Sequence, residues 1–248
     1  MNNETKSKVA IVQARYGSTR LRGKIFKNLS GKPMLWHVLN RISYSKLIDK
    51  VVVATTTDPL DNKTEDFCKE NKIGFYRGSI DDVLTRYYEA AMQFEAEIII
   101  RITSDCPLVD PVIVDKMLNE FINNPNSCDY LSNIVKRTFP RGLDTEIFSF
   151  DALEKAFAEA ETGSEREHVT QYIYSHPNLF TIKNYANDVD YSFYRWTVDT
   201  EEDFKLIEEI YNSLYTSGEL FLFDDVLRLM QKNPSLININ KNVKQKPA

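Results

Sequence analysis

A loop rich in cationic side chains follows the first apolar run of this 248-residue chain. The run Val9–Val12 opens into Gln13–Lys24, which carries two glycines and four Arg or Lys side chains. Between Glu4 and Asp49 the chain has no carboxylate, although it has ten Lys and Arg residues there. Glycines allow close approach of the backbone, and N–H groups with Arg and Lys side chains hold phosphate oxygens. The segment therefore predicts a site for a polyanion, since a merely solvated surface would intersperse both signs of charge.

Neither of the common phosphate-binding fingerprints is present in this loop. A P-loop requires G-x4-G-K followed by Ser or Thr, whereas here five residues separate Gly17 from Gly23, and Ile25 follows Lys24. A dinucleotide fingerprint requires G-x-G-x-x-G after the strand, and only Gly17 lies in that window. The loop belongs to neither class.

Two aspartates are candidates for a divalent-cation site near the loop. Asp105 follows the apolar run Ile98–Ile102, and Asp199 follows Phe193–Val198, which we predict to be a strand. Open α/β sheets bind ligands at the carboxyl ends of their strands, so both carboxylates could reach one magnesium ion. The alternative is that each is a turn or helix-capping residue. Asp110, directly before a proline, is better explained as a cap.

The elements that must position these residues indicate an α/β protein. Short apolar runs alternate with amphipathic stretches, which predicts a mostly parallel, Rossmann-like open sheet with helices on both faces. Predicted strands cover 9–14, 51–55, 74–77 and 98–102, and later extended segments cover 180–185 and 193–198. Predicted helices cover 34–43, 59–71, 81–94, a stretch from 111, 151–161, 164–175, 201–214 and 223–231. A turn signal at 124–127 marks a change of rhythm, so we expect one domain, 1–248, with 125–195 as a small inserted lobe.

Composition excludes several classes of function. The net charge of −5 argues against general nucleic-acid binding, which usually shows a basic domain. No stretch approaches the roughly 18 apolar residues that span a membrane, and the amino terminus shows no apolar signal region. Three widely spaced cysteines fit reduced thiols better than a disulfide framework or zinc site. We therefore expect a cytoplasmic protein with no nucleic-acid or membrane partner.

Several segments together resemble the cytidylyltransferases that activate acidic sugars, the CMP-sialate and CMP-KDO synthetases. The resemblance is closest to their spore-coat-polysaccharide branch and covers about residues 9–204. The basic loop is similar to the family's A-R-x-G-S-x-R-x-P-x-K segment, although Arg22 stands where the family often has proline. Further matches are R-G-S-x-x-D-V-L-x-R-Y at 77–87, two aspartate motifs at 103–108 and 198–200, and R-E-H-V-T at 166–170.

The resemblance implies an enzyme that transfers CMP from CTP to an acidic sugar or related acceptor and releases pyrophosphate, for surface polysaccharide or glycoconjugate biosynthesis. It implies Mg²⁺ at Asp105 and Asp199, and catalytic roles for Arg15, Lys24 and Asp105. Implied nucleotide-binding residues are Gln13, Ala14, Arg15, Gly17, Ser18, Arg20, Lys24, Thr55, Arg77, Gly78, Ser79, Asp82 and Val83. Implied acceptor-binding residues are Arg141, Asp144, Glu146 and His168. The resemblance and the many aromatic residues of the 125–195 segment also point to a homodimer.

Two other functions remain open at this point. A glycosyltransferase that uses a nucleotide sugar can have a similar sheet and metal site, but that class usually carries Asp-x-Asp, and here Asp105 stands between Ser104 and Cys106. A non-catalytic nucleotide-binding protein would leave both aspartates without a role. Release of pyrophosphate, of a nucleoside diphosphate or of nothing distinguishes the three.

Overall fold

A seven-stranded mixed sheet forms the centre of the computed structural model, which describes residues 6–123 and 128–245. The strand order is β5-β4-β1-β6-β8-β7-β9. In this sheet β8 is antiparallel to both of its neighbours, β6 and β7. The pairs β5–β4, β4–β1, β1–β6 and β7–β9 are parallel. The prediction of a mostly parallel sheet is therefore confirmed. The turn predicted at 124–127 lies outside the described residues.

The strands of the first half agree with the apolar runs in the sequence, because runs buried on both faces are typical of parallel sheets. The strands of the sheet are β1 (Lys8–Gln13), β4 (Lys50–Thr56), β5 (Gly74–Gly78), β6 (Ile98–Thr103), β7 (Tyr130–Ser132), β8 (Glu146–Ser149) and β9 (Ile182–Asn184). A short hairpin of β2 (Asn28–Leu29) and β3 (Lys32–Pro33) was not predicted.

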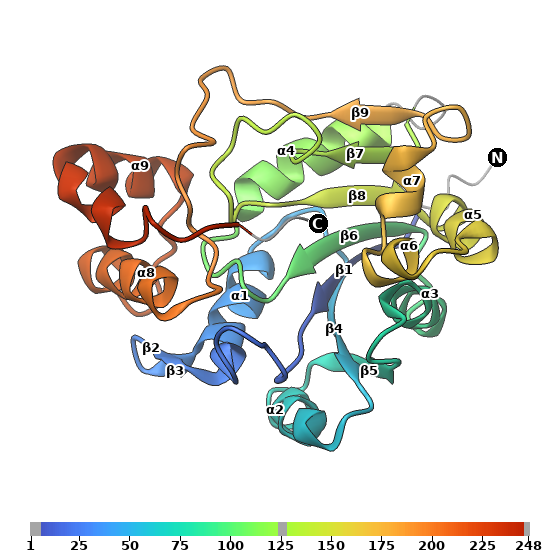
Figure 1. Cartoon of the computed structure of the whole chain (residues 1–248), viewed down its shortest axis with the longest axis horizontal. Helices are drawn as coiled ribbons and strands as arrows, with labels where there is room; N and C mark the ends of the chain where they lie inside the picture. The colour runs from blue at the N-terminus through green and yellow to red at the C-terminus, as the bar shows by residue number, and fades with distance from the viewer. Residues whose placement is uncertain (1–5, 124–127, 246–248) are drawn as a thin grey trace.

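Helices cover both faces of the sheet, as predicted. They are α1 (Met34–Ile42), α2 (Asn62–Glu70), α3 (Val83–Gln93), α4 (Pro111–Asn123), α5 (Phe150–Glu159), α6 (Gly163–Glu167), α7 (Gln171–Ser175), α8 (Glu201–Leu214) and α9 (Phe223–Lys232). Side chains of β1 alternate between two apolar clusters: Ala10 and Val12 pack with α1, α4 and α8, whereas Val9 and Ile11 pack with α3 and α5. In Figure 1, α8 and α9 lie together on the left, and α3, α5 and α6 lie on the right.

The order of the strands places a ligand-binding edge between β1 and β6. From β1 the chain continues to β4 and β5 on one side, and then crosses through α3 to β6 on the other side of β1. Gln13 at the end of β1 is in register with Thr103 at the end of β6. Such a reversal of direction in an open α/β sheet leaves a crevice at the carboxyl ends of the strands. The basic loop follows β1 at this edge, and Asp105 follows β6 at the same edge.

Two parts of the second half differ from the sequence interpretation. The single helix predicted at 164–175 is two short helices, α6 and α7, separated by a turn in which Val169 has φ of 36°. The segment 193–198 is not a strand; it forms one isolated parallel β-bridge, between Arg195 and Arg141. Its aromatic residues instead pack against α9; the Trp196 and Phe223 rings lie 6.0 Å apart. Aromatic residues buried by such packing give the sequence the same apolar pattern as a buried strand.

The described part of the 125–195 segment is continuous with the main sheet. It supplies β7, β8 and β9, and β8 pairs with β6 along Ile98–Arg101. The carboxyl-terminal tail also packs against the domain: Asn240 is buried and donates from Nδ2 to Asp203 Oδ1 at 2.9 Å, and Gln245 accepts a hydrogen bond from Arg195 at 2.6 Å. In the described part of the chain, no helix is long and apolar enough to cross a membrane.

Candidate functional site

The ammonium group of Lys24 joins the two aspartates that the sequence singled out. Its Nζ lies 3.0 Å from Oδ2 of Asp105, 3.0 Å from Oδ1 of Asp199 and 2.7 Å from the carbonyl oxygen of Val198. Lys24 begins the single-turn helix η1 (Lys24–Phe26) and is 8% exposed. Three segments that are far apart in the sequence therefore meet at one cation.

Burial and charge act in opposite directions on this cluster. Burial alone favours neutral Lys24, but the charges of Asp105 and Asp199 outweigh it and raise the pKa of Lys24. Burial alone likewise favours protonated Asp105, but Lys24 and a hydrogen bond from Thr103 outweigh it and lower the pKa of Asp105. Lys24 and Asp105 are therefore both charged at neutral pH.

Asp105 is held just beyond the end of β6. Its Oδ1 accepts a hydrogen bond from the hydroxyl of Thr103 at 2.6 Å. Its backbone carbonyl accepts from the N–H of Val198 at 2.8 Å and from the hydroxyl of Thr197 at 3.2 Å. Asp199 is therefore brought to β6 by this link and not by a strand of the sheet, which corrects the sequence interpretation.

Asp199 does not cap the helix that follows it. Thr200 is the cap of α8: its hydroxyl accepts from the N–H of Asp203 at 3.3 Å, and Asp203 completes a capping box. Oδ2 of Asp199 instead accepts from Arg195 at 2.9 Å and pairs with Arg20 at 2.8 Å. Asp199 is thus surrounded by three cationic side chains, which is unusual for a structural cap.

Asp105 is not a cap either, because Asp110 has that role. Oδ1 of Asp110 accepts from the N–H groups of Val112 at 2.8 Å and Ile113 at 3.2 Å, at the start of α4. The prediction that Asp110 is an N-cap is confirmed. Oδ2 of Asp110 also accepts from the N–H of Phe223 at 2.7 Å, which ties α4 to α9.

Tyr16 closes the basic loop. Its carbonyl oxygen accepts from the N–H groups of Ser18 at 2.9 Å and Gly23 at 3.0 Å. Gly23 has φ of 69°, and a Cβ there would lie 2.9 Å from the Tyr16 ring, so glycine is required. Gly17 has no such requirement, because a Cβ there would meet open space. The N–H of Tyr16 donates to Asp61 at 2.7 Å, an anchor that the sequence gave no sign of.

The cluster opens into a groove made of two adjoining cavities of about 640 and 590 Å³. Gln13, Arg15, Arg101, Glu167 and His168 line both. The predicted site residues that line the larger cavity are Gln13, Arg15, Ser18, Arg20, Lys24, Asp105, Asp144, His168 and Asp199. Those that line the smaller cavity are Gln13, Arg15, Asp82, Val83 and His168. The remaining predicted residues, which line neither, are Ala14, Gly17, Thr55, Arg77, Gly78, Ser79, Arg141 and Glu146.

Arg77 connects three segments of the protein through hydrogen bonds. Its guanidinium donates to the carbonyl oxygens of Thr56 at 2.8 Å and Asp58 at 2.9 Å, and to a carboxylate oxygen of Glu65 at 2.5 Å. These bonds tie β5 to the loop after β4 and to α2. A direct contact between Arg77 and a nucleotide stays a prediction.

The loop before α3 is linked to α6 across the smaller cavity. Asp82 caps α3 by accepting from the N–H of Thr85 at 2.9 Å, and its second oxygen accepts from Arg166 Nε at 2.7 Å. Arg166 also donates to the hydroxyl of Thr85 at 2.8 Å. This contact fixes the distance between the segments that carry Asp82 and His168.

Glu146 is buried and fully committed to protein partners. It is 3% exposed, pairs with Arg101 and accepts hydrogen bonds from the hydroxyls of Tyr130 and Thr170. Arg101 lines both cavities, and Thr170 follows the turn that carries His168. Glu146 therefore fixes Arg101, which lines the groove, and Thr170, which lies next to the turn that lines it.

The turn at His168 is strained. Val169 has φ of 36°, a left-handed conformation that a β-branched residue rarely adopts. Such strain persists where the surroundings fix it, and here the neighbouring Thr170 is fixed by Glu146. The break between α6 and α7 leaves Glu167 and His168 on the wall of the groove.

Asp144, which lines the larger cavity, forms an ion pair with Arg137. Arg137 donates from both terminal nitrogens, at 2.6 and 2.9 Å, to the two carboxylate oxygens of Asp144. Gly142, with φ of 110°, packs so tightly on Trp196 that a Cβ would lie 2.5 Å from its backbone carbon. This close approach places Asp144 near the segment that carries Asp199.

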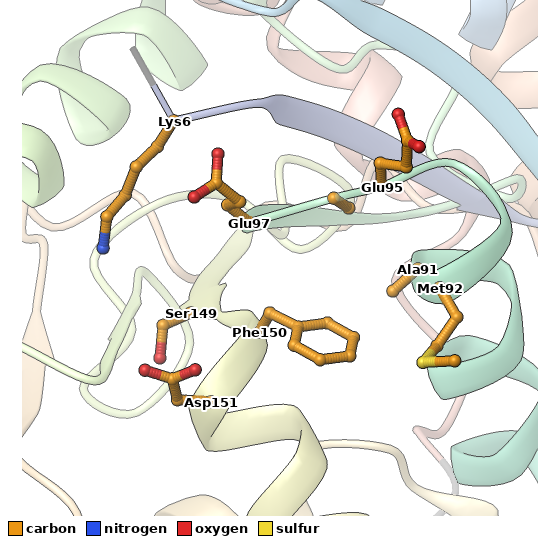
Figure 2. Close-up of a pocket in the computed structure, with 9 residues that line it drawn as sticks. Lys6, Ala91, Met92, Glu95, Glu97, Ser149, Phe150 and Asp151 are labelled. Atoms are coloured by element: carbon orange, nitrogen blue, oxygen red, sulfur yellow. The ribbon is translucent and has the colours of Figure 1, made fainter. Parts of the chain in front are cut away.

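A third cavity, of about 390 Å³, lies at the opposite edge of the sheet. Figure 2 shows Lys6 and Asp151 on the left, Met92 on the right and Phe150 between them. Glu97 is engaged there by the N–H of Ser7 at 2.8 Å. This cavity contains none of the predicted site residues.

Comparisons with known proteins match nearly the whole chain. A family profile described as Cytidylyltransferase matches residues 9–241. An uncharacterized protein of Methanocaldococcus jannaschii, MJ1063, is 38% identical over 243 residues, which cover 96% of each chain. The spore coat polysaccharide biosynthesis protein SpsF of Bacillus subtilis is 29% identical over 231 residues, 90% of this chain and 94% of that one.

Solved structures agree in fold. A cytidylyltransferase from Leptospira borgpetersenii has a TM-score of 0.90 and 36% identity, and the match covers 98% of this chain and all of that one. A CMP:2-keto-3-deoxy-manno-octonic acid synthetase solved with CTP has a TM-score of 0.63 and 18% identity over 84% of this chain and 99% of that one. The second match bears on the fold alone.

Proposed function

Because this chain belongs to the cytidylyltransferase family and is a CTP-dependent nucleotidyltransferase, we propose that it transfers CMP to an acidic sugar or related acceptor. In this reaction an acceptor oxygen forms a bond to the α-phosphorus of CTP, the bond from that phosphorus to the β-phosphate oxygen breaks, and pyrophosphate leaves. The product would serve surface polysaccharide or glycoconjugate biosynthesis, and we place the reaction in the cytoplasm. The relation to SpsF supports the polysaccharide context.

The convergence of Asp105 and Asp199 on one cation, inside the cavity lined by the basic loop, carries this proposal. Transfer of a nucleotidyl group needs chiefly positioning and neutralisation of charge, not a covalent nucleophile. Arg15, Arg20 and Lys24 would supply positive charge for the triphosphate. All three side chains line the larger cavity, as such a role requires.

The two aspartates fit a Mg²⁺ ion. Each presents a carboxylate oxygen to the same point, and magnesium is usually held by one or two carboxylates together with substrate phosphates and water. Among the described residues no group of three or more His, Cys, Asp or Glu side chains could hold a metal alone. Asp105 and Asp199 would therefore hold the ion, which neutralises phosphate charge, only with the nucleotide completing its ligands.

The acceptor would lie at the other end of the larger cavity. Asp144 and His168 line that cavity together with the aspartates, which supports their assignment to the acceptor. Arg141 lines neither cavity and Glu146 is buried, so any part of theirs in acceptor binding would be indirect. The smaller cavity, lined by Asp82 and Val83, is our candidate for the nucleoside.

Pyrophosphate release tests the proposed function. The enzyme would be incubated with CTP, Mg²⁺ and a panel of acidic sugars, amino sugars and phosphonates, and pyrophosphate would be measured, with ATP, GTP and UTP in place of CTP as controls. Acceptor-dependent release from CTP supports the proposal. A nucleoside diphosphate released from a nucleotide sugar would indicate a glycosyltransferase, and binding of CTP without turnover of any acceptor would contradict the proposed reaction.

We also propose that the 125–195 segment contributes to a homodimer. Phe193 is 62% exposed and Val135 and Val189 are also exposed, although all three are large and apolar. Light scattering at micromolar concentration measures the mass directly. A mass equal to that of one chain would contradict the dimer.

A further inference from the structure

Lys24 has no free donor for a phosphate in this structure. An ammonium group has three N–H donors, and the three oxygens within hydrogen-bond distance of Nζ belong to Asp105, Val198 and Asp199. Lys24 can therefore bind a triphosphate only if it leaves at least one of these partners. The phosphate-binding role and the observed contacts are two alternative states of one side chain.

The position of the ammonium is also the position that a metal would need. A Mg²⁺ ion held by Asp105 and Asp199 would lie about 2.0–2.1 Å from an oxygen of each, between the oxygens that now face Nζ at 3.0 Å. Both cations cannot occupy this space. Entry of the metal therefore requires Lys24 to move.

The charges around the aspartates are balanced without a metal. Lys24, Arg20 and Arg195 face Asp105 and Asp199, and Arg195 also pairs with the buried Asp203 at 2.8 Å. Three positive charges thus face three negative ones. A divalent cation alone would add charge to a neutral cluster and repel Lys24, whereas a metal that arrives with a triphosphate brings the anion to which Lys24 can transfer.

The structure leaves Lys24 room for this transfer. Its backbone is fixed by the bond from its N–H to Leu21 at 3.2 Å and by the glycine before it. Its side chain, however, lines the larger cavity, together with Ser18 and Arg20 of the basic loop. Rotation of the flexible four-carbon stem would move the ammonium from the aspartates toward phosphates held by that loop.

We propose that Lys24 is an internal counter-ion that keeps the Asp105–Asp199 site closed to free metal and opens it when the nucleotide arrives. This inference rests on the proposed function. Mg²⁺ and CTP then bind with positive coupling, and each raises the affinity for the other by the same factor. Lys24 acts here as a positioning residue, because it determines when the aspartates become available.

Binding of Mn²⁺ to the full-length protein without nucleotide tests the proposal. Free Mn²⁺ would be measured by electron paramagnetic resonance for the wild type, Lys24→Met and Lys27→Met. Lys27 is the matched control, because it directly follows the same short helix but pairs with Glu201 outside the site. We expect Lys24→Met to bind Mn²⁺ at least about tenfold more tightly than the wild type, because a repelling charge is gone, while Lys27→Met is unchanged.

The gain must come from the two aspartates. Adding Asp105→Asn to Lys24→Met should therefore abolish it. Should Lys24→Met fold poorly by circular dichroism, Lys24→Gln keeps a donor for Val198 without the charge and is compared in the same way. Unchanged or weaker Mn²⁺ binding in the folded Lys24 variant would overturn the proposal, because Lys24 would then organise the metal site and not close it.

These outcomes are separate from those of the proposed function. Titration of CTP into the wild type shows whether the groove binds the nucleotide at all. If CTP does not bind, the proposed function fails, while the Mn²⁺ comparison still decides whether Lys24 shields the aspartates.

Discussion

We expect replacement of Glu146 by glutamine to lower the stability of the fold without removing a direct contact with substrate. The substitution keeps the shape of the side chain but removes the negative charge that Arg101 faces in the protein interior. Loss of one partner from a buried pair costs about 3–5 kcal/mol, because the other charge is left uncompensated. The hydroxyl of Tyr130, which donates to Glu146 at 2.9 Å, also loses a charged acceptor.

The loss can be measured as a shift of the melting temperature. For a protein of this size about 1 kcal/mol corresponds to roughly 2–4 °C, so Glu146→Gln should melt about 6–20 °C lower. Glu201→Gln is the control: Glu201 forms a pair with Lys27 that is 67% exposed on the glutamate side, and such surface pairs contribute at most about 1 kcal/mol. Scanning calorimetry or urea unfolding gives both values. An unchanged melting temperature together with a raised KM for the acceptor would refute this reasoning and place Glu146 in contact with substrate.

Two further predictions concern the basic loop and the thiols. Arg15→Ala should weaken CTP binding by about tenfold to a hundredfold, because a charge-assisted bond to phosphate contributes about 1.5–3 kcal/mol, and an unchanged calorimetric affinity would remove this residue from the nucleotide site. Burial raises the pKa of Cys68 to about 12 and that of Cys128 to about 11, so both thiols stay protonated at about pH 8, below their folded pKa and near the value of a free thiol. A thiol reagent should therefore label them slowly in the native protein, faster as the pH rises toward 11, and at once in urea; rapid native labelling at about pH 8 would contradict this.

The strands that carry the site could be predicted because their apolar runs are unambiguous. The runs at β1 and β6 are buried on both faces, and their adjacency follows from the rule for open α/β sheets. The sequence also indicated the two aspartates. The route by which Asp199 reaches Asp105 could not be predicted, because it depends on the backbone bond from Val198 to Asp105.

Other features have no signal in a single sequence. A left-handed φ at Val169 contradicts the preference of a β-branched residue and arises from the tertiary contact of Thr170 with Glu146. The anchoring of the basic loop by Asp61 links positions 45 residues apart through one hydrogen bond. Arg195 pairs with both Asp199 and Asp203, which only the three-dimensional structure brings to the same side.

The role of Asp105 and Asp199 as metal ligands is tested most directly by Mg²⁺-dependent pyrophosphate release by Asp105→Asn and Asp199→Asn. Asparagine keeps the size and hydrogen-bonding capacity of the side chain but lacks the charge that a hard cation requires. We expect CTP turnover with a productive acceptor to fall by at least about a hundredfold in each variant while the protein remains folded by circular dichroism. Near-normal release by both folded variants would contradict a metal site at Asp105 and Asp199.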